Sequence, residues 1–105
     1  MKPYRNHPDV PAEVDAAASW YEEQEPGLGL EFVLAVESAI ALICDAPHAW
    51  QLWPGTPSEL GIRRFVMRRF PFAVSYLDEP AEVVIVAVSH AKRKPLYWLH
   101  RIRGR

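Results

Sequence analysis

The amino-acid sequence predicts an α+β fold: an N-terminal helical hairpin packed on a twisted antiparallel sheet of three to four strands, followed by a short basic-aromatic segment. Apolar residues recur at spacings of three and four over the first half of the chain, and the spacing changes to two after residue 60. Helices that precede a run of strands, instead of alternating with them, are typical of α+β domains. One hydrophobic core fills a chain of 105 residues, so we expect a single domain over residues 1–105.

The first half of the chain predicts two helices. Helical spacing begins at Pro11, a residue suited to the first turn of a helix, and Asp9 is a candidate N-cap. The sequence EPGLG ends this helix, and a second apolar stripe runs from Leu28 to about Ile43, before Pro47. Because the connection is short, the two helices should lie antiparallel as a hairpin.

The second half predicts three consecutive antiparallel strands, over residues 61–70, 72–78 and 82–90. The last of these is apolar on both faces and should therefore be central. Two prolines in residues 1–10 restrict any strand there to a short one at an edge. We expect the helices to cover one face of the sheet and the other face, which carries alternate arginines, to be open.

Composition restricts the classes of protein that this chain can belong to. The longest apolar run, Val83 to Val88, is six residues long and far too short to cross a bilayer. No signal-peptide pattern opens the chain, and the single cysteine, Cys44, fits a reducing compartment and a buried position in a helix. We therefore expect a cytoplasmic protein with no membrane partner.

Charge is distributed unequally along the chain. Residues 1–60 carry two basic and ten acidic residues, a net charge of −8, whereas residues 61–105 carry ten basic and three acidic residues, a net charge of +7. Such asymmetry suggests a surface that binds an anion, a nucleic acid or an acidic protein segment. The alternative is that the two halves neutralise each other within the fold.

The basic-aromatic segment SHAKRKPLYWLHR, residues 89–101, follows the central strand directly. Arginine binds phosphate oxygens, histidine transfers protons near neutral pH, and aromatic rings stack on exposed bases. Arginine, histidine and tyrosine together would suffice for RNA cleavage without a metal. The alternative is that Tyr97 and Trp98 fold back onto the core and that His90 binds the backbone at the strand end. The histidines lack metal-site spacing, so we expect no metal and no other cofactor.

The sequence resembles the RelE/ParE superfamily of toxins from type II toxin–antitoxin modules. The resemblance rests on four blocks, which occur in the order that the family uses: AAASWYEEQEPGLGLEF (16–32), IRRFVMRRFPFAVSY (62–76), VVIVAVSH (83–90) and HAKRKPLYW (90–98). The spaced H-R-P-YW ending is typical of ParE-like plasmid-stabilisation members. The resemblance implies a helical hairpin on a twisted sheet and a growth-arresting toxin that a cognate antitoxin keeps silent.

The same resemblance implies one of two targets. RelE-like members are endoribonucleases that cleave mRNA in the ribosomal A site, whereas ParE-like members poison DNA gyrase. In a metal-free ribonuclease the residues that would act here are Arg63, Arg69, His90, Arg93 and Tyr97. The residues expected to bind the target in either branch are Arg64, Arg68, Lys92, Lys94, Trp98 and Arg101.

Two features of the sequence favour different branches. The loop HAWQLWPGTPSELG, residues 48–61, lacks the lysines that RelE-like members concentrate there, which favours gyrase as the target. His90 and Tyr97 keep the ribonuclease branch open. A third possibility is a non-toxic relative that only binds its partner protein.

Overall fold

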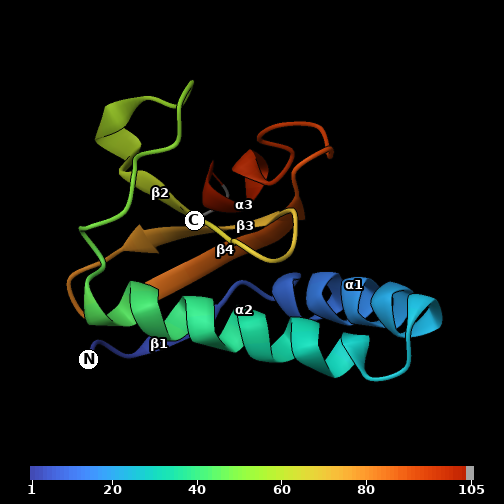
Figure 1. Ribbon diagram of the computed structural model, residues 1–105. Coiled ribbons are helices and arrows are strands. Elements are labelled where there is room, and N and C mark those ends of the chain that lie inside the picture. Colours follow the sequence, from blue (N-terminus) through green and yellow to red (C-terminus); the bar gives the residue numbers. More distant parts are fainter. Residues whose placement is uncertain (104–105) are drawn as a thin grey trace.

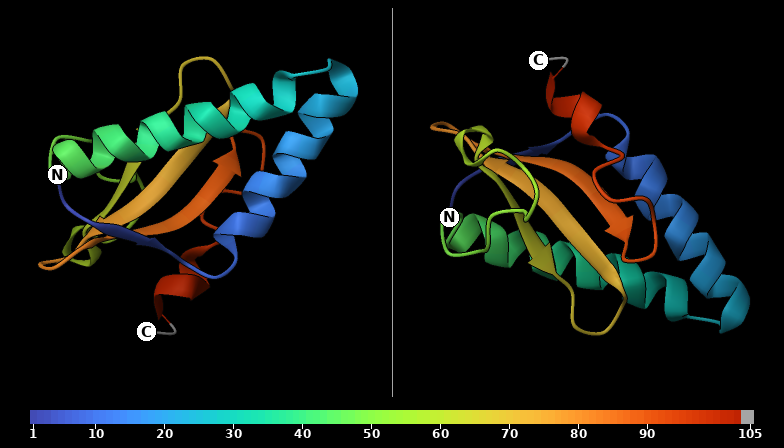
Figure 2. Two further views of the ribbon diagram at one scale, coloured as in Figure 1. Left: turned by 90° about the horizontal axis from the view of Figure 1, so that it is seen from below. Right: turned by 90° about the horizontal axis from the view of Figure 1, so that it is seen from above.

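The computed structural model describes residues 1–103. Two long helices lie on one face of a four-stranded sheet, and the C-terminal segment with its short helix lies on the other (Figures 1 and 2). The elements in chain order are β1 (Tyr4–Asn6), α1 (Val10–Gln24), α2 (Leu28–Asp45), a 3₁₀ turn (Ser58–Leu60), β2 (Ile62–Val66), β3 (Phe72–Asp78), β4 (Val83–His90) and α3 (Leu99–Arg103). The predicted α+β class and helical hairpin are confirmed.

The hairpin is held closed at the junction between α1 and α2. The carboxylate of Glu22 accepts hydrogen bonds from the backbone N–H groups of Gly27 and Gly29, at 3.0–3.1 Å, and so places a negative charge at the N-terminus of α2. A Cβ atom on Gly29 would lie only 2.6 Å from the carbonyl oxygen of Ala18. Glycine at position 29 therefore lets the two helices approach closely.

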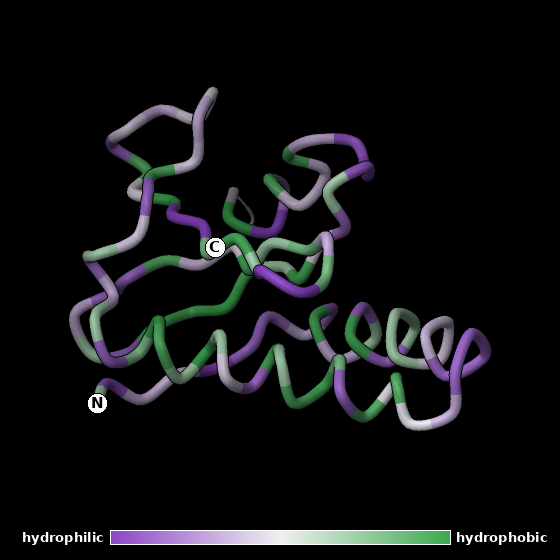
Figure 3. The backbone as a smooth tube through the Cα atoms, viewed as in Figure 1, coloured by the Kyte–Doolittle hydropathy of each residue, from purple (hydrophilic) through white to green (hydrophobic). Residues whose placement is uncertain are grey.

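The sheet has the order β1-β4-β3-β2, so β4 is interior, as predicted. The residues of β4 are mostly hydrophobic (Figure 3), and every residue from Val83 to Ser89 is buried. The prediction of a wholly antiparallel sheet is wrong for its fourth member, because β1 runs parallel to β4. Parallel neighbours need a long crossover, and here α1, α2, β2 and β3 all lie between the paired strands.

The first long strand is shorter than its alternating pattern predicts. β2 ends at Val66, and the chain then turns so that Met67 and Phe70 both enter the core. The Met67 N–H still donates to the carbonyl of Phe72 at 2.9 Å, which closes the turn into β3. The pattern of residues 67–70 therefore reflects a buried turn and not a continuing strand.

The main core lies between the hairpin and the sheet. An aromatic cluster of Tyr21, Phe32, Phe70 and Phe72 fills one end, with ring centroids 4.8–6.3 Å apart. Cys44 is buried in the same core, as predicted. None of the helices in residues 1–103 has the length and apolar character that a bilayer span requires.

The second face of the sheet is covered, contrary to the expectation that it would be open. Trp98 is 1% exposed and packs in a second core with Ile62, Val84 and Val86. Trp53 joins this core from the loop before β2, and its indole N–H donates to the hydroxyl of Ser75 at 2.9 Å. The alternative in which Trp98 folds back onto the core is therefore confirmed.

We predict that Trp98→Ala lowers the free energy of unfolding by about 3–5 kcal/mol, because it empties the centre of the second core. The matched control is Trp20→Ala, since Trp20 is 57% exposed on α1. The control should cost at most about 1 kcal/mol. Denaturant unfolding of both variants is the measurement, and equal losses would show that the second core contributes little.

Candidate functional site

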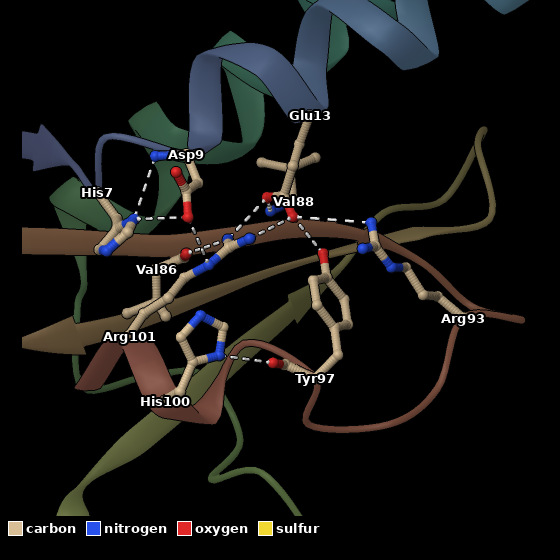
Figure 4. A network of polar contacts seen from close by, with 9 residues as sticks. All are labelled: His7, Asp9, Glu13, Val86, Val88, Arg93, Tyr97, His100 and Arg101. Carbon is tan, nitrogen blue, oxygen red and sulfur yellow. Dashed lines mark hydrogen bonds and ion pairs between the residues drawn. The ribbon is translucent and has the colours of Figure 1, made fainter. Parts of the chain in front are cut away.

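One carboxylate, that of Glu13, joins α1, β4 and the C-terminal segment (Figure 4). Its side chain is 10% exposed. It accepts hydrogen bonds from the backbone N–H of Val88 at 3.1 Å, from the Tyr97 hydroxyl, and from both terminal nitrogens of Arg101 at 3.0 and 3.1 Å. Four donors thus replace the water that a carboxylate loses on burial.

Arg101 is slightly more deeply buried than its partner Glu13, with a side chain that is 7% exposed. Its Nη1 also donates to the carbonyl oxygen of Val86 at 3.0 Å, and its Nε lies 3.5 Å from Oδ2 of Asp9. The two-pronged contact with Glu13 uses the planar fork that arginine alone provides. Arg101 therefore fastens α3 to β4 and to the start of α1.

This ion pair lies where β4 has lost its neighbouring strand. β1 pairs with β4 only as far as Ile85, and the register between β3 and β4 then skips Val86, as at a β-bulge. A bulge turns the following backbone groups toward the opposite side of a strand. At the bulge the carbonyl of Val86 accepts from Arg101, and beyond it the backbone N–H of Val88 donates to Glu13. The side chains of Glu13 and Arg101 therefore form the hydrogen bonds to β4 that a neighbouring strand would otherwise form.

Burial and the hydrogen bond to Glu13 raise the pKa of the Tyr97 hydroxyl well above the ordinary value of 10.0. The phenol is therefore protonated at neutral pH and donates a hydrogen bond to the Glu13 carboxylate. Burial alone would lower the pKa of Arg101, but the hydrogen bonds and charge of Glu13 outweigh it and the pKa is raised. Arg101 remains a cation at all ordinary pH values.

Arg93 covers this network from the solvent side. Its guanidinium lies 3.7 Å from the centre of the Tyr97 ring, and its Nη1 lies 4.0 Å from Oε2 of Glu13. The Arg93 side chain is 55% exposed, so one side of it stacks on the ring and the other faces solvent. Among the three predicted site residues Lys92, Arg93 and Lys94, Arg93 is the one whose charged group stacks on an aromatic ring.

A groove of about 350 Å³, which we call the C-terminal groove, opens beside this arginine. Five predicted site residues line it: Arg64, His90, Arg93, Lys94 and Trp98. The guanidinium of Arg64 lies over the Trp53 ring at 4.7 Å. The His90 ring packs edge-on against Phe72, and its Nδ1 accepts the Lys92 N–H at 2.9 Å, which confirms the backbone alternative for His90.

The structure places the other predicted residues away from this groove or beneath it. Arg63 donates to the carbonyl oxygen of Trp50 at 2.6 Å, and Arg69 forms an exposed ion pair with Glu31 at 2.6 Å. Arg68 is exposed just after β2. Trp98 lines the groove but is buried, and Arg101 is buried in the polar network, so the expectation that both lie on an exposed surface is wrong.

The two charged halves of the chain neutralise each other only in part. Arg69, Arg93 and Arg101 form ion pairs with acidic residues of the first half, and Lys2 and Arg5 pair with Asp78 and Glu82 of the second. Among the side chains that the structure describes, five cations form no ion pair: Arg63, Arg64, Arg68, Lys92 and Lys94. Three of these five, Arg68, Lys92 and Lys94, are exposed, so the protein keeps a basic surface.

Glu13 was not among the residues singled out from the sequence. A signal for it exists, since Glu13 lies three residues after Val10 and four before Ala17, on the stripe that faces the core. An acidic residue within an apolar stripe indicates a buried partner of opposite charge. The sequence does not reveal which of the twelve lysine and arginine residues that partner is. No group of three or more side chains suited to a metal ion occurs in the described part of the chain.

No protein-family model matches this chain, and no curated protein matches it. Its fold is similar to that of one chain in the solved structure of the chromosomal ParDE TA system from P. aeruginosa, with a TM-score of 0.73 and 18% sequence identity. The similarity covers 86% of this chain and 96% of that chain. At this identity the likeness shows a shared fold, and the fold implied by the RelE/ParE resemblance is confirmed.

We predict that Glu13→Gln destabilises the protein by about 3–5 kcal/mol, because the buried Arg101 then loses its buried counter-charge and keeps only the exposed Asp9. The side chain keeps its size, so lost packing does not contribute. The double variant Glu13→Gln with Arg101→Met removes both charges and should recover part of the loss. Chemical denaturation of the three proteins tests this, and a fully stable Glu13→Gln variant would contradict it.

The raised pKa of Tyr97 predicts a loss of stability at alkaline pH. A group whose pKa is higher in the folded state contributes its full stability below its unfolded pKa, here about 10. Above that pH the unfolded chain loses the proton first, so stability falls. Thermal melts against pH should show this decline, and it should be shallower in Tyr97→Phe. Unchanged slopes in that variant would exclude the hydroxyl as the source.

Proposed function

We propose that this protein is the toxin of a type II toxin–antitoxin module and that it arrests growth by binding DNA gyrase. The observation that carries the proposal is the fold shared with a chain of the ParDE TA system over most of both chains. The sequence blocks that resemble ParE-like toxins lie over the α1–α2 junction, over β2 and β3, in β4, and in the C-terminal segment around Arg93. A cognate antitoxin would hold the toxin silent in the cytoplasm.

The geometry of the candidate catalytic residues supports binding over RNA cleavage. The Tyr97 hydroxyl is committed to Glu13, Arg63 to a backbone carbonyl and Arg69 to a surface ion pair. A general base needs a pKa near the working pH, and the pKa of Tyr97 is raised far from it. Only His90 and Arg93 of the five candidates line the C-terminal groove.

The surface proposed to contact the target is the rim of the C-terminal groove. Arg64, Arg93 and Lys94 line the groove, and Lys92 is exposed on the same segment. Arg93 is the strongest candidate because stacking on Tyr97 orders its guanidinium while leaving it accessible. In this proposal Trp98 and Arg101 position the segment from beneath, and Arg68 contributes charge at the end of β2.

We predict that expression of the protein alone arrests growth and that the purified protein inhibits supercoiling by gyrase. Arg93→Ala should abolish both effects, while stability changes by only about 0.5 kcal/mol because the side chain is exposed. Tyr97→Phe keeps the ring beneath Arg93 and should keep the activity, provided that thermal melts show it folded.

Three other results would lead to different conclusions. Cleavage of mRNA that requires ribosomes, with supercoiling unaffected and Tyr97→Phe inactive, would establish the ribonuclease branch. Partner binding without any growth effect would favour the non-toxic interaction module. Full toxicity of a folded Arg93→Ala variant would remove the C-terminal groove from the proposal.

A further inference from the structure

A second groove lies on the opposite side of β2 from β3, against α2. We call it the edge groove; its volume is about 610 Å³. Ala35, Ala39 and Leu42 of α2 form one wall, and residues 64–69 form the other. β2 is an edge strand of the sheet (Figure 1), and the lining residues place the groove along its outer edge.

The edge of β2 is only partly paired by the chain itself. Residues 51–53 pair with its first half. The backbone N–H of Trp53 donates to the carbonyl of Ile62 at 2.8 Å, and the backbone N–H of Arg64 donates to the carbonyl of Gln51 at 2.9 Å. Backbone groups two residues apart on a strand point to the same side. Val66 therefore directs its N–H and C=O outward, into the edge groove, and no hydrogen bond to them from another segment occurs within residues 1–103.

The walls of this groove are apolar and carry two donors without acceptors. Val66 is 59% exposed and Leu42 is 49% exposed, which is high for large apolar side chains. Trp50 Nε1 and Arg64 Nε are buried nitrogen atoms with no hydrogen-bond partner in the described residues, and both residues line the groove. Because both atoms are buried, an occupant of the groove would contact mainly the exposed apolar side chains of Val66 and Leu42.

Charge identifies the kind of occupant. Arg64 and Arg68 on the β2 side form no ion pair in the described chain, whereas Arg69, at the end of the groove, is neutralised by Glu31. Two unpaired arginines beside an apolar floor complement a segment in which apolar and acidic residues alternate. An open strand edge accepts such a segment as an additional strand.

We propose that the edge groove receives an extended acidic segment of the antitoxin, which pairs with Val66 and presents a carboxylate to Arg68. This inference rests on the proposed function, from which it takes the partner. It also supplies a route to silencing, because Arg64 and Val66 line both grooves. A carboxylate bound to Arg64 from the edge groove neutralises a cation of the C-terminal groove.

The test uses the full chain and the protein encoded by the adjacent reading frame, with affinity measured by calorimetry. Val66→Pro removes the outward N–H without removing a bond to β3, since proline is tolerated at a strand edge. Val66→Thr is its matched control and keeps the N–H. Arg68→Glu reverses the charge at the groove, and Lys92→Glu makes the same change on the C-terminal segment.

We expect Val66→Pro and Arg68→Glu each to weaken binding about tenfold or more, since each removes a contact and adds a penalty. Val66→Thr should bind within about twofold of the original protein because it keeps the outward N–H, and Lys92→Glu should do so because Lys92 does not line the edge groove. Thermal melts must show all four variants folded. Salt should weaken binding of the original protein more than that of Arg68→Glu.

The opposing outcomes separate this inference from the proposed function. If the adjacent protein binds and silences the toxin, but Val66→Pro and Arg68→Glu bind it normally, the edge groove is not its site. Weaker binding by Lys92→Glu alone would place the partner on the C-terminal segment. A homodimer that Val66→Pro dissociates, with partner binding unchanged, would make a second copy the occupant. Failure of the original protein to bind, together with harmless expression, would overturn both proposals.

Discussion

The rest of this structure depends on the need to satisfy the interior strand where its neighbour ends. β1 is three residues long and pairs with β4 only to Ile85, which leaves backbone groups at Val86 and Val88 facing the protein interior. Unpaired backbone groups in such a place cost as much as lost hydrogen bonds. Glu13 and Arg101, 88 positions apart in sequence, satisfy them together. The charge pair therefore determines where the end of the chain lies.

This arrangement gives the C-terminal segment two chemically different sides. The inner side carries the ring of Trp98 into the second core and the charge of Arg101 to Glu13. The outer side carries Lys92, Arg93 and Lys94, all exposed. A buried ion pair gains little net stability, because desolvation offsets most of its attraction, but its geometry is exacting. Its contribution here is to fix the register of a segment whose outer side is the proposed working surface.

Local pattern was enough to predict the parts of the fold whose residues contact their near neighbours. The start of α2 at Leu28, all of β3 and the interior place of β4 follow from apolar spacing and from turn residues. The early end of β2 at Val66 and the parallel pairing of β1 depend on segments far away in sequence, so spacing could not reveal them. The same distinction applies to the site. Residues 90–98 are recognisable from the sequence as a basic-aromatic block, because they are contiguous. Their buried carboxylate partner, Glu13, lies on α1 and is far away in sequence.

The charge asymmetry of the chain acquires a physical meaning once the ion pairs are known. Much of it is used inside the fold, where Arg69, Arg93 and Arg101 pair with acidic residues of the helices. What remains unpaired in the described chain is concentrated along β2 and the start of the C-terminal segment. Arg64 belongs to both grooves, so an anion bound in one lowers the positive potential of the other. In the proposed module, silencing would thus require no large movement of the toxin. A partner strand beside β2 would compete electrostatically with the target for a guanidinium that both need.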